Sequence, residues 1–322
     1  MRRRLLLSAA LSAPSFIGFR AAAAERVIGF VSPEARESMT AIVAAFRAGL
    51  ADNAKPGAAP IRVVERYADG KLDAVPGIVA QLEKLPVNLI MAQGAATLPV
   101  VRAKRTVPVV YGYSGDPVVA GIAQSLARPG GDSTGATFMA IELNPKRVDL
   151  VREALPACRR IALLSNARHA GEELEITACE RAVAPAGIEL VVLRAQTAAD
   201  IPPALAGALE SRVDAVMALP SASMVQATPM IVEACAARGV PLVSGWAQMA
   251  HSGALFTYGP ELKAAYRGVA RHAVRILDGA KPGDLPIERP SVFELVVNQR
   301  TAKRLGLTLP STLLARADEV IE

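Results

Sequence analysis

The sequence contains few of the residues from which reactive and metal sites are most often built. Its 322 residues include three cysteines, three histidines and one tryptophan, and aromatic residues make up 4% of the chain. Cys158, Cys179 and Cys235 lack the spacing of zinc ligands and could form at most one disulfide, so burial as small apolar side chains is the favoured interpretation. No two histidines share a helix face, and none has metal-ligand spacing with a cysteine. We therefore expect no metal site.

The chain also lacks long apolar segments and basic clusters beyond its first 24 residues. Arg2, Arg3 and Arg4 precede an apolar stretch at 5–19 that is too short and too interrupted to span a bilayer well. Three alanines at 22–24 follow, which completes the pattern of a cleavable export signal, and we place the cut before Glu25. A short membrane anchor is the alternative, and the consecutive arginines leave open a twin-arginine route.

Removal of residues 1–24 takes away four arginines and lowers the formal net charge from +6 to +2. No basic cluster then remains to follow a phosphate backbone, so we expect no nucleic-acid partner. No later segment is apolar enough for membrane insertion. The mature protein is expected to be a soluble, periplasmic monomer.

Short apolar runs alternate with longer segments of helical spacing. Runs that are apolar on both faces and separated by helices indicate parallel strands covered on both sides. The expected strands lie at 27–31, 61–67, 89–91, 107–111, 161–164, 189–193, 215–219 and 241–244. The sequence therefore predicts an α/β fold with parallel sheets.

The strands fall into two sets of four, with turn residues at 128–132 after the first set. A strand at 135–141 should cross between the sets near 137–140, and a helix should open at Asn144-Pro145. Later segments indicate a strand at 254–258, a helix at 260–278, a strand at 293–297 and a helix from about 299. We therefore expect two similar lobes with a cleft between them. Lobe 1 spans 25–138, with 257–282 returning to it, and lobe 2 spans 139–256, with 283–322 returning to it.

Small polar residues and helix starts follow the expected strands, where ligands bind in open parallel sheets. Free backbone N–H groups at such helix starts suit an anion such as a carboxylate. The candidate ligand-binding residues of the first lobe are Ser32, Gln93, Gly94, Ala95, Ala96, Thr97, Ser114, Asp116, Pro117 and Thr137. Those of the second lobe and its crossover are Asn166, Arg168, His169, Ser221, Trp246 and Tyr258.

Several of these candidates have a structural alternative. Asp116 could be the counter-charge for a ligand ammonium or the N-cap of a helix that starts at Pro117. The turn at Gly94 could hold a carboxylate or only pack a strand against a helix. Trp246 could stack on a planar ligand or fill the rim of the cleft. Tyr258 could line the cleft or support the hinge.

A series of short motifs runs through the chain from residue 27 onward. They are Asp116-Pro117-Val118, residues 125–131 with Thr134-Gly135, Tyr258-Gly259-Pro260 with Tyr266-Arg267, residues 281–286, and the C-terminal segments 293–298, 301–303, 305–307 and 316–321. In this order and spacing the chain resembles the extracytoplasmic solute-binding proteins of the tryptophan/tyrosine-type ABC importer family. It departs from the family at Asp132, where asparagine is usual, and at residues 166–169, where the family often has Asn-Pro.

The resemblance implies a type I periplasmic-binding-protein fold, with two Rossmann-like lobes joined by three crossovers. It implies no catalysis and no cofactor, and it implies a permease and an ATPase, supplied by other chains, as partners. The expected function is capture of a small polar ligand, an amino acid or an aromatic acid, by closure of the lobes. A sensor subunit for a membrane receptor is an alternative that this chain alone does not separate from import.

A third reading, a secreted serine hydrolase, comes from the G-x-S-x-G pattern at 131–135. A nucleophile of that type needs a strand before Ser133 and a helix after it. Here Pro129-Gly130 precede the pattern and a strand-like run follows, so a turn into a strand is favoured.

Overall fold

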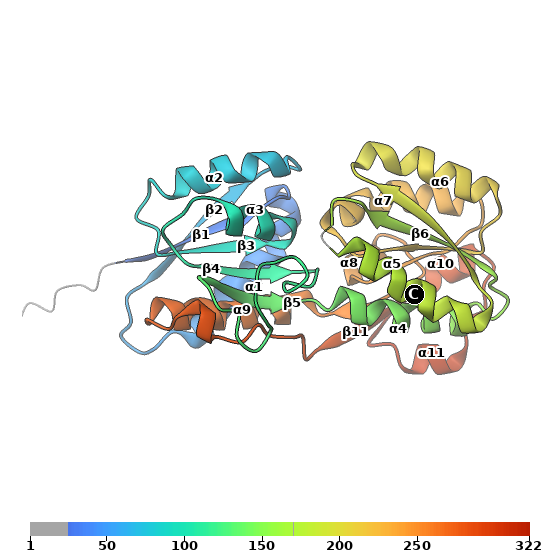
Figure 1. Cartoon of the computed structure of the whole chain (residues 1–322). Helices are drawn as coiled ribbons and strands as arrows, with labels where there is room; N and C mark the ends of the chain where they lie inside the picture. Colours follow the sequence, from blue (N-terminus) through green and yellow to red (C-terminus); the bar gives the residue numbers. More distant parts are fainter. Residues whose placement is uncertain (1–24, 170) are drawn as a thin grey trace, which may run out of the picture.

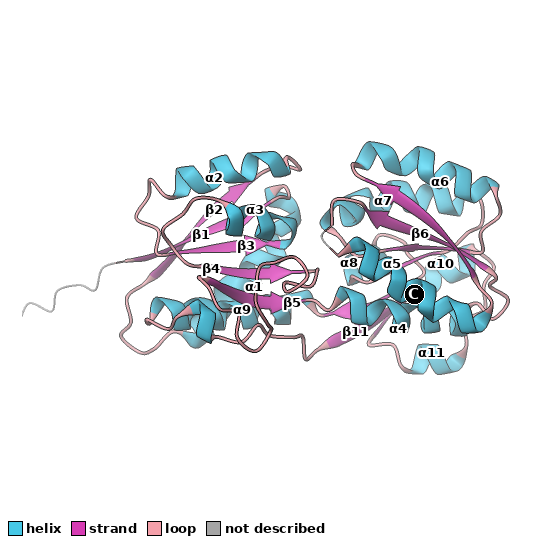
Figure 2. Ribbon diagram, in the orientation of Figure 1, coloured by secondary structure: helices cyan, strands magenta, loops and turns pink. Residues whose placement is uncertain are grey.

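The computed structural model describes residues 25–169 and 171–322, which form two lobes that lie side by side (Figure 1). Each lobe is a β-sheet with helices on both faces, as Figure 2 shows. The export signal that we predict at 1–24 falls outside the described residues. Within the described ranges, no helix is long and apolar enough to cross a membrane.

Lobe 1 has a five-stranded, fully parallel sheet in the order β2-β1-β3-β4-β5. The strands are β1 (Arg26–Ser32), β2 (Ile61–Tyr67), β3 (Leu89–Gln93), β4 (Val109–Tyr113) and β5 (Ser133–Thr137). The helices are α1 (Arg36–Asn53), α2 (Val75–Leu82), α3 (Thr97–Arg102) and α9 (Leu262–Leu277). Apolar residues of α1 and α9 pack on one face of the sheet, and those of α2 and α3 pack on the other. Burial of both faces accounts for the near-continuous apolar runs of these strands.

Lobe 2 has a seven-stranded sheet in the order β12-β11-β10-β9-β8-β6-β7. The strands are β6 (Arg160–Asn166), β7 (Glu189–Ala195), β8 (Ala215–Ala218), β9 (Leu242–Ser244), β10 (Phe256–Pro260), β11 (Phe293–Asn298) and β12 (Glu319–Ile321). One core cluster joins the sheet to α4 (Ala140–Ala154), α5 (Glu172–Val183), α10 (Gln299–Arg304) and α11 (Ser311–Ala315). A second cluster joins it to α6 (Ile201–Glu210), α7 (Ala222–Ala236) and α8 (Ala247–His251).

Three segments cross between the lobes, as the resemblance implied. The chain leaves lobe 1 after β5, leaves lobe 2 after β10 to form α9, and returns to lobe 2 along β11. Because β10 and β11 carry the chain in opposite directions, they pair antiparallel. The sheet of lobe 2 is therefore mixed, whereas the sequence predicted a parallel sheet. We expected the chain to return to lobe 1 at residue 257 and to lobe 2 at residue 283, but both crossings lie later in the chain. Residues 257–260 belong to β10, and Ile287 and Glu288 still contact lobe 1, where the Glu288 N–H donates to the Gly135 carbonyl (2.8 Å).

The first crossover differs from our expectation at its end. We predicted a strand to residue 141 and a helix from Asn144, whereas β5 ends at Thr137, α4 begins at Ala140, and Pro145 lies within the helix. The change of direction occurs at Met139, which adopts a left-handed conformation (φ 55°) that is uncommon for a non-glycine residue. This turn joins a strand of lobe 1 to a helix of lobe 2.

A buried arginine ties the crossovers together. Arg147 of α4 is 1% exposed, and its Nε donates to the Tyr258 carbonyl (2.8 Å) while its Nη1 donates to Asn144 Oδ1 (2.5 Å). Burial lowers the pKa of Arg147 to about 10, so the guanidinium is still charged at neutral pH. The Tyr258 carbonyl is therefore held against α4, and the Tyr258 ring stacks on Phe293 of β11 with centroids 6.3 Å apart.

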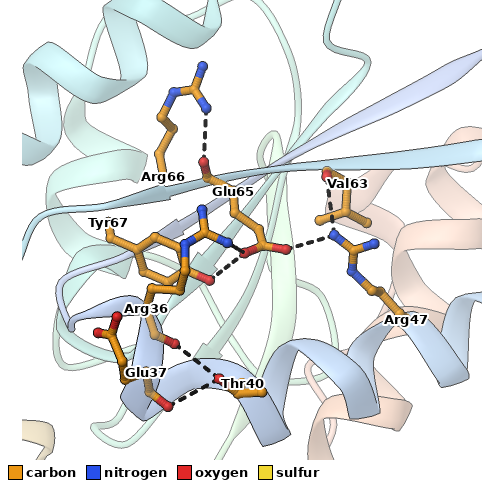
Figure 3. A network of polar contacts seen from close by, with 8 residues as sticks. All are labelled: Arg36, Glu37, Thr40, Arg47, Val63, Glu65, Arg66 and Tyr67. Carbon is orange, nitrogen blue, oxygen red and sulfur yellow. Dashed lines mark hydrogen bonds and ion pairs between the residues drawn. The ribbon is translucent and has the colours of Figure 1, made fainter.

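The start of α1 is fixed by a polar network on β2 (Figure 3). Glu65 accepts hydrogen bonds from Arg36 Nη1 (2.7 Å), Arg47 Nη2 (2.7 Å) and Tyr67 Oη (2.6 Å), and the Arg36 guanidinium lies 4.8 Å from the centre of the Tyr67 ring. Burial alone would raise the pKa of Glu65, but the hydrogen bonds from Tyr67 and Arg47 and the two arginine charges outweigh it and lower that pKa. The network holds the first turn of α1, and with it the preceding residue Glu34, against the sheet.

Candidate functional site

A cavity of about 270 Å³ lies between the two lobes. Its wall in lobe 1 is formed by the ends of β1, β3 and β4 with the segments that follow them, and its wall in lobe 2 by the corresponding ends of β6, β8 and β9. The carboxyl ends of the strands therefore meet at this cavity, as expected for open α/β sheets. A volume of this size suits one small solute.

Nine of the sixteen candidate residues line the cavity. They are Gln93, Gly94, Ala95, Ser114, Asn166, Arg168, His169, Ser221 and Trp246. Both lobes contribute, so the structure brings together residues that are more than 150 positions apart in the sequence.

Of the other candidates, Ser32, Ala96 and Thr97 lie just behind the cavity wall. Ser32 is fully buried, and its Oγ donates to Gln93 Oε1 (3.1 Å) and accepts from the Glu34 N–H (3.0 Å). It thus orients two residues that do line the cavity. Ala96 and Thr97 are buried where β3 turns into α3.

The remaining four candidates, Asp116, Pro117, Thr137 and Tyr258, lie outside the lining of this cavity. Asp116 Oδ1 accepts from the N–H groups of Val118 (2.7 Å) and Val119 (3.1 Å), as an N-cap would, but the expected helix does not start at Pro117, since residues 117–121 form a turn. Thr137 Oγ1 donates to the Gly115 carbonyl (3.1 Å) and steadies the first crossover. The Tyr258 carbonyl accepts from Arg147, as described above, and none of the four lines the interlobe cavity.

Two pairs of side chains bridge the cavity from lobe to lobe. Ser114 Oγ of lobe 1 lies 2.9 Å from His169 Nε2 of lobe 2, and the amide of Gln226 in α7 donates to Glu34 Oε2. The His169 ring also lies against Tyr113, with centroids 6.0 Å apart. These contacts exist only when the lobes are close together, so they hold the cleft in a closed arrangement.

His169 is supported from behind by a buried carboxylate. Its Nδ1 lies 2.9 Å from Glu175 Oε1, and Glu175 is 1% exposed. The contact of Nε2 with Ser114 and the closeness of Nδ1 to Glu175 place the imidazole between the two lobes. Burial, together with the charge of Glu175, raises the pKa of Tyr113 to about 12, so its phenol is neutral at the cavity wall.

The lobe 2 wall presents hydroxyl and amide groups at the start of α7. Ser221 Oγ accepts from the Met224 N–H (3.3 Å) as the N-cap, and lies 3.0 Å from Ser223 Oγ. Asn166 Nδ2 donates to Ser223 Oγ (3.2 Å). Arg168 lies on the same side and is exposed. This wall is therefore rich in hydrogen-bond donors and carries one cation.

Several residues of the cavity were missed from the sequence. The most informative are Glu34, Arg102, Tyr113, Phe138 and Gln226. Tyr113 is the last residue of β4, one position before a candidate, so a wider window at the strand end would have included it. Gln226 lies one helical turn after Ser223, on the same side of α7, a spacing that the sequence does contain. Glu34 gave no signal beyond its position just after β1.

The geometry does not support a serine nucleophile. Ser133 is buried and opens β5, and the residues after it continue as a strand and not as a helix. The required strand–turn–helix is thus absent at this position. All three cysteines are buried and free, which confirms their burial, and within 25–169 and 171–322 no group of three or more His, Cys, Asp or Glu side chains could hold a metal ion.

Comparison with known proteins identifies the family. Residues 26–321 match the family model described as ABC transporter substrate binding protein. The tyrosine-binding protein of Clostridioides difficile (strain R20291) is 22% identical over 206 residues, a match that spans 64% of this chain and 59% of that protein.

Two solved structures share the whole architecture. The ABC domain from Streptococcus pneumoniae in complex with L-Trp is 21% identical, with a TM-score of 0.84, and the match covers 92% of this chain and all of that one. A conserved domain protein from Vibrio cholerae is 22% identical, with a TM-score of 0.83, over 92% of this chain and 99% of that one. With the match over nearly its full length, the chain belongs to the family of ABC transporter substrate-binding proteins, which bind solutes and are not catalytic.

Proposed function

We propose that this protein captures one small polar solute, an amino acid or an aromatic acid, in the interlobe cavity and delivers it to an ABC importer. The observation that carries the proposal is the cavity itself, which is lined by the strand ends of both lobes and bridged by the Ser114–His169 and Glu34–Gln226 pairs. A solute held there would touch both lobes and stabilise the closed arrangement over the open one.

The lining of the cavity favours a solute with both flat and polar parts. Tyr113, Phe138 and Trp246 supply buried aromatic surface, and the serines, asparagine and glutamines supply hydrogen-bond donors and acceptors. One relative is named a tyrosine-binding protein, and the structure from Streptococcus pneumoniae is a complex with L-Trp. Both amino acids are solutes of this kind.

The cellular setting follows from family membership and from residues 1–24. Substrate-binding proteins of ABC transporters work outside the cytoplasm, and we propose that this chain reaches the periplasm by a signal cleaved before Glu25. There it would act as a monomer that docks on a permease, with an ATPase as the third component. No cofactor takes part.

A thermal-shift panel tests the proposal. The mature protein is screened against amino acids, aromatic acids, nucleosides and sugars, and a true solute should raise the melting temperature in a concentration-dependent way. Trp246 is the only tryptophan and lines the cavity, so excitation of its indole places the binding event there. If no compound shifts the melting temperature or changes the Trp246 emission, the proposal is wrong.

A further inference from the structure

Glu34 is a buried carboxylate that faces the cavity without a basic partner. It is 5% exposed, and its hydrogen-bond partner among the described side chains is the neutral amide of Gln226. The other buried carboxylates differ. Glu175 lies 2.9 Å from His169, and Glu172 lies 3.7 Å from Arg194. Within the part of the chain that the structure describes, Glu34 is thus the buried acid that forms no ion pair.

Such a residue is costly unless something compensates its charge. A carboxylate removed from water loses hydration that a single amide hydrogen bond does not replace. Burial accordingly raises the pKa of Glu34 to about 7, with no compensating charge from the protein. Nothing in the fold requires an acid here, because a neutral glutamine would fill the same space and accept the same hydrogen bond. The carboxylate is therefore suited to a cation from outside the chain.

The cavity wall also carries two positive charges. Arg102 of lobe 1 and Arg168 of lobe 2 are exposed side chains at the cavity wall. They can meet an anionic group of a solute, while the opposite pole is left to Glu34. The wall therefore has a negative and a positive region, which matches a solute that carries both charges.

We propose that Glu34 binds an ammonium group of the solute, so that the protein selects amines, amino acids among them, over aromatic acids that lack nitrogen. This inference rests on the proposed function and narrows its ligand class. It also moves the ammonium counter-charge from Asp116, whose carboxylate accepts from two N–H groups of the turn after it, to the loop after β1.

The test uses matched pairs that differ only in the amine. The pairs are L-tyrosine with 3-(4-hydroxyphenyl)propanoate and L-phenylalanine with 3-phenylpropanoate, and each amine hit of the wider panel is paired in the same way. Affinities are measured by calorimetry at pH 8 on the unmodified protein, on Glu34→Gln and on Glu37→Gln. Glu37 is an exposed acid of α1 outside the cavity, so its variant controls for the loss of one negative charge.

We expect the unmodified protein to bind the amine of a pair about 100-fold more tightly than its deaminated partner, as for a desolvated charge pair. Glu34→Gln should remove most of that preference, and Glu37→Gln should leave it intact. A binder that lacks nitrogen, or an amine whose affinity survives Glu34→Gln, would overturn this inference and leave solute capture standing. If no compound binds at all, solute capture itself fails.

The pH profile provides a second readout. An ammonium requires the ionised form of Glu34, so the amine affinity should fall by about tenfold per pH unit below pH 7. The other ionisable groups at the cavity wall are Arg102, Arg168 and His169, and Tyr266 of α9 lies near Glu34. Glu34→Gln separates these contributions. A profile that is equally steep in that variant would assign the dependence to another group and contradict the role of Glu34.

Discussion

Replacement of Glu34 by glutamine should stabilise the protein above neutral pH, even though it removes a residue of the cavity. Burial raises the pKa of this carboxyl from its ordinary 4.5 to about 7, so the folded state holds the proton more tightly than the unfolded state. The contribution of the protonated Glu34 carboxyl to the free energy of unfolding is fully present below pH 4.5 and is lost as the pH rises through 7. At about 1.4 kcal/mol per pKa unit, the loss amounts to about 3 kcal/mol at pH 8. Glutamine does not titrate and can still accept the hydrogen bond from Gln226.

Urea unfolding followed by far-ultraviolet circular dichroism at pH 5 and pH 8 measures this difference. Glu34→Gln should exceed the unmodified protein by about 3 kcal/mol at pH 8 and by less than about 1 kcal/mol at pH 5. Glu65→Gln is the matched comparison. Its carboxyl has a lowered pKa, so the variant should be less stable than the unmodified protein at pH 8. The reasoning would be refuted if the difference in free energy of unfolding between Glu34→Gln and the unmodified protein did not change with pH, or if the variant were the less stable of the two at pH 8.

Three further outcomes are expected. Ser114→Ala removes the interlobe contact with His169 and should weaken solute binding about fivefold in calorimetry, since one hydrogen bond contributes about 1 kcal/mol; unchanged affinity would mean that the contact does not help closure. Gly259→Ala places a methyl group against the carbonyl of Gly245, which follows β9 directly, and should lower the free energy of unfolding by at least about 2 kcal/mol. A change below about 0.5 kcal/mol in urea unfolding would show that the backbone adjusts. Protein recovered from the periplasmic fraction should begin at Glu25 in N-terminal sequencing, and an intact N-terminus there would contradict cleavage.

Much of the fold could be predicted from the sequence because each strand depends on a local run of apolar residues. Two-sided apolar runs such as 161–164 and 215–219 become buried parallel strands, as β6 and β8 show. The antiparallel pairing of β10 with β11 was not predictable in the same way. It results from the path of the chain between lobes, which no single segment encodes. The turn at Met139 was missed for a related reason, since its backbone conformation is unusual for methionine and is held by the surrounding crossover.

The candidate site could be predicted at the level of strand ends but not of individual side chains. Residues such as Gln93 and Ser221 follow strands directly and line the cavity, as the topology requires. Asp116 also follows a strand, yet its carboxylate turns back to cap its own loop. Conversely, Glu34 is a candidate binding residue because the folded protein places no basic side chain beside its carboxylate. A missing cation is a property of the folded neighbourhood and leaves no pattern in the sequence.

The central claim is that one solute is enclosed between the two lobes, in the cavity that both sets of strand ends line. A crystal structure of the mature protein with the solute found by the thermal-shift panel tests it most directly. We predict density for the solute between the Gln93–Ala95 turn and Trp246, with its ammonium within hydrogen-bond distance of the Glu34 carboxylate. Solute bound to one lobe alone, or on the outer surface with the cavity unfilled, would contradict the account.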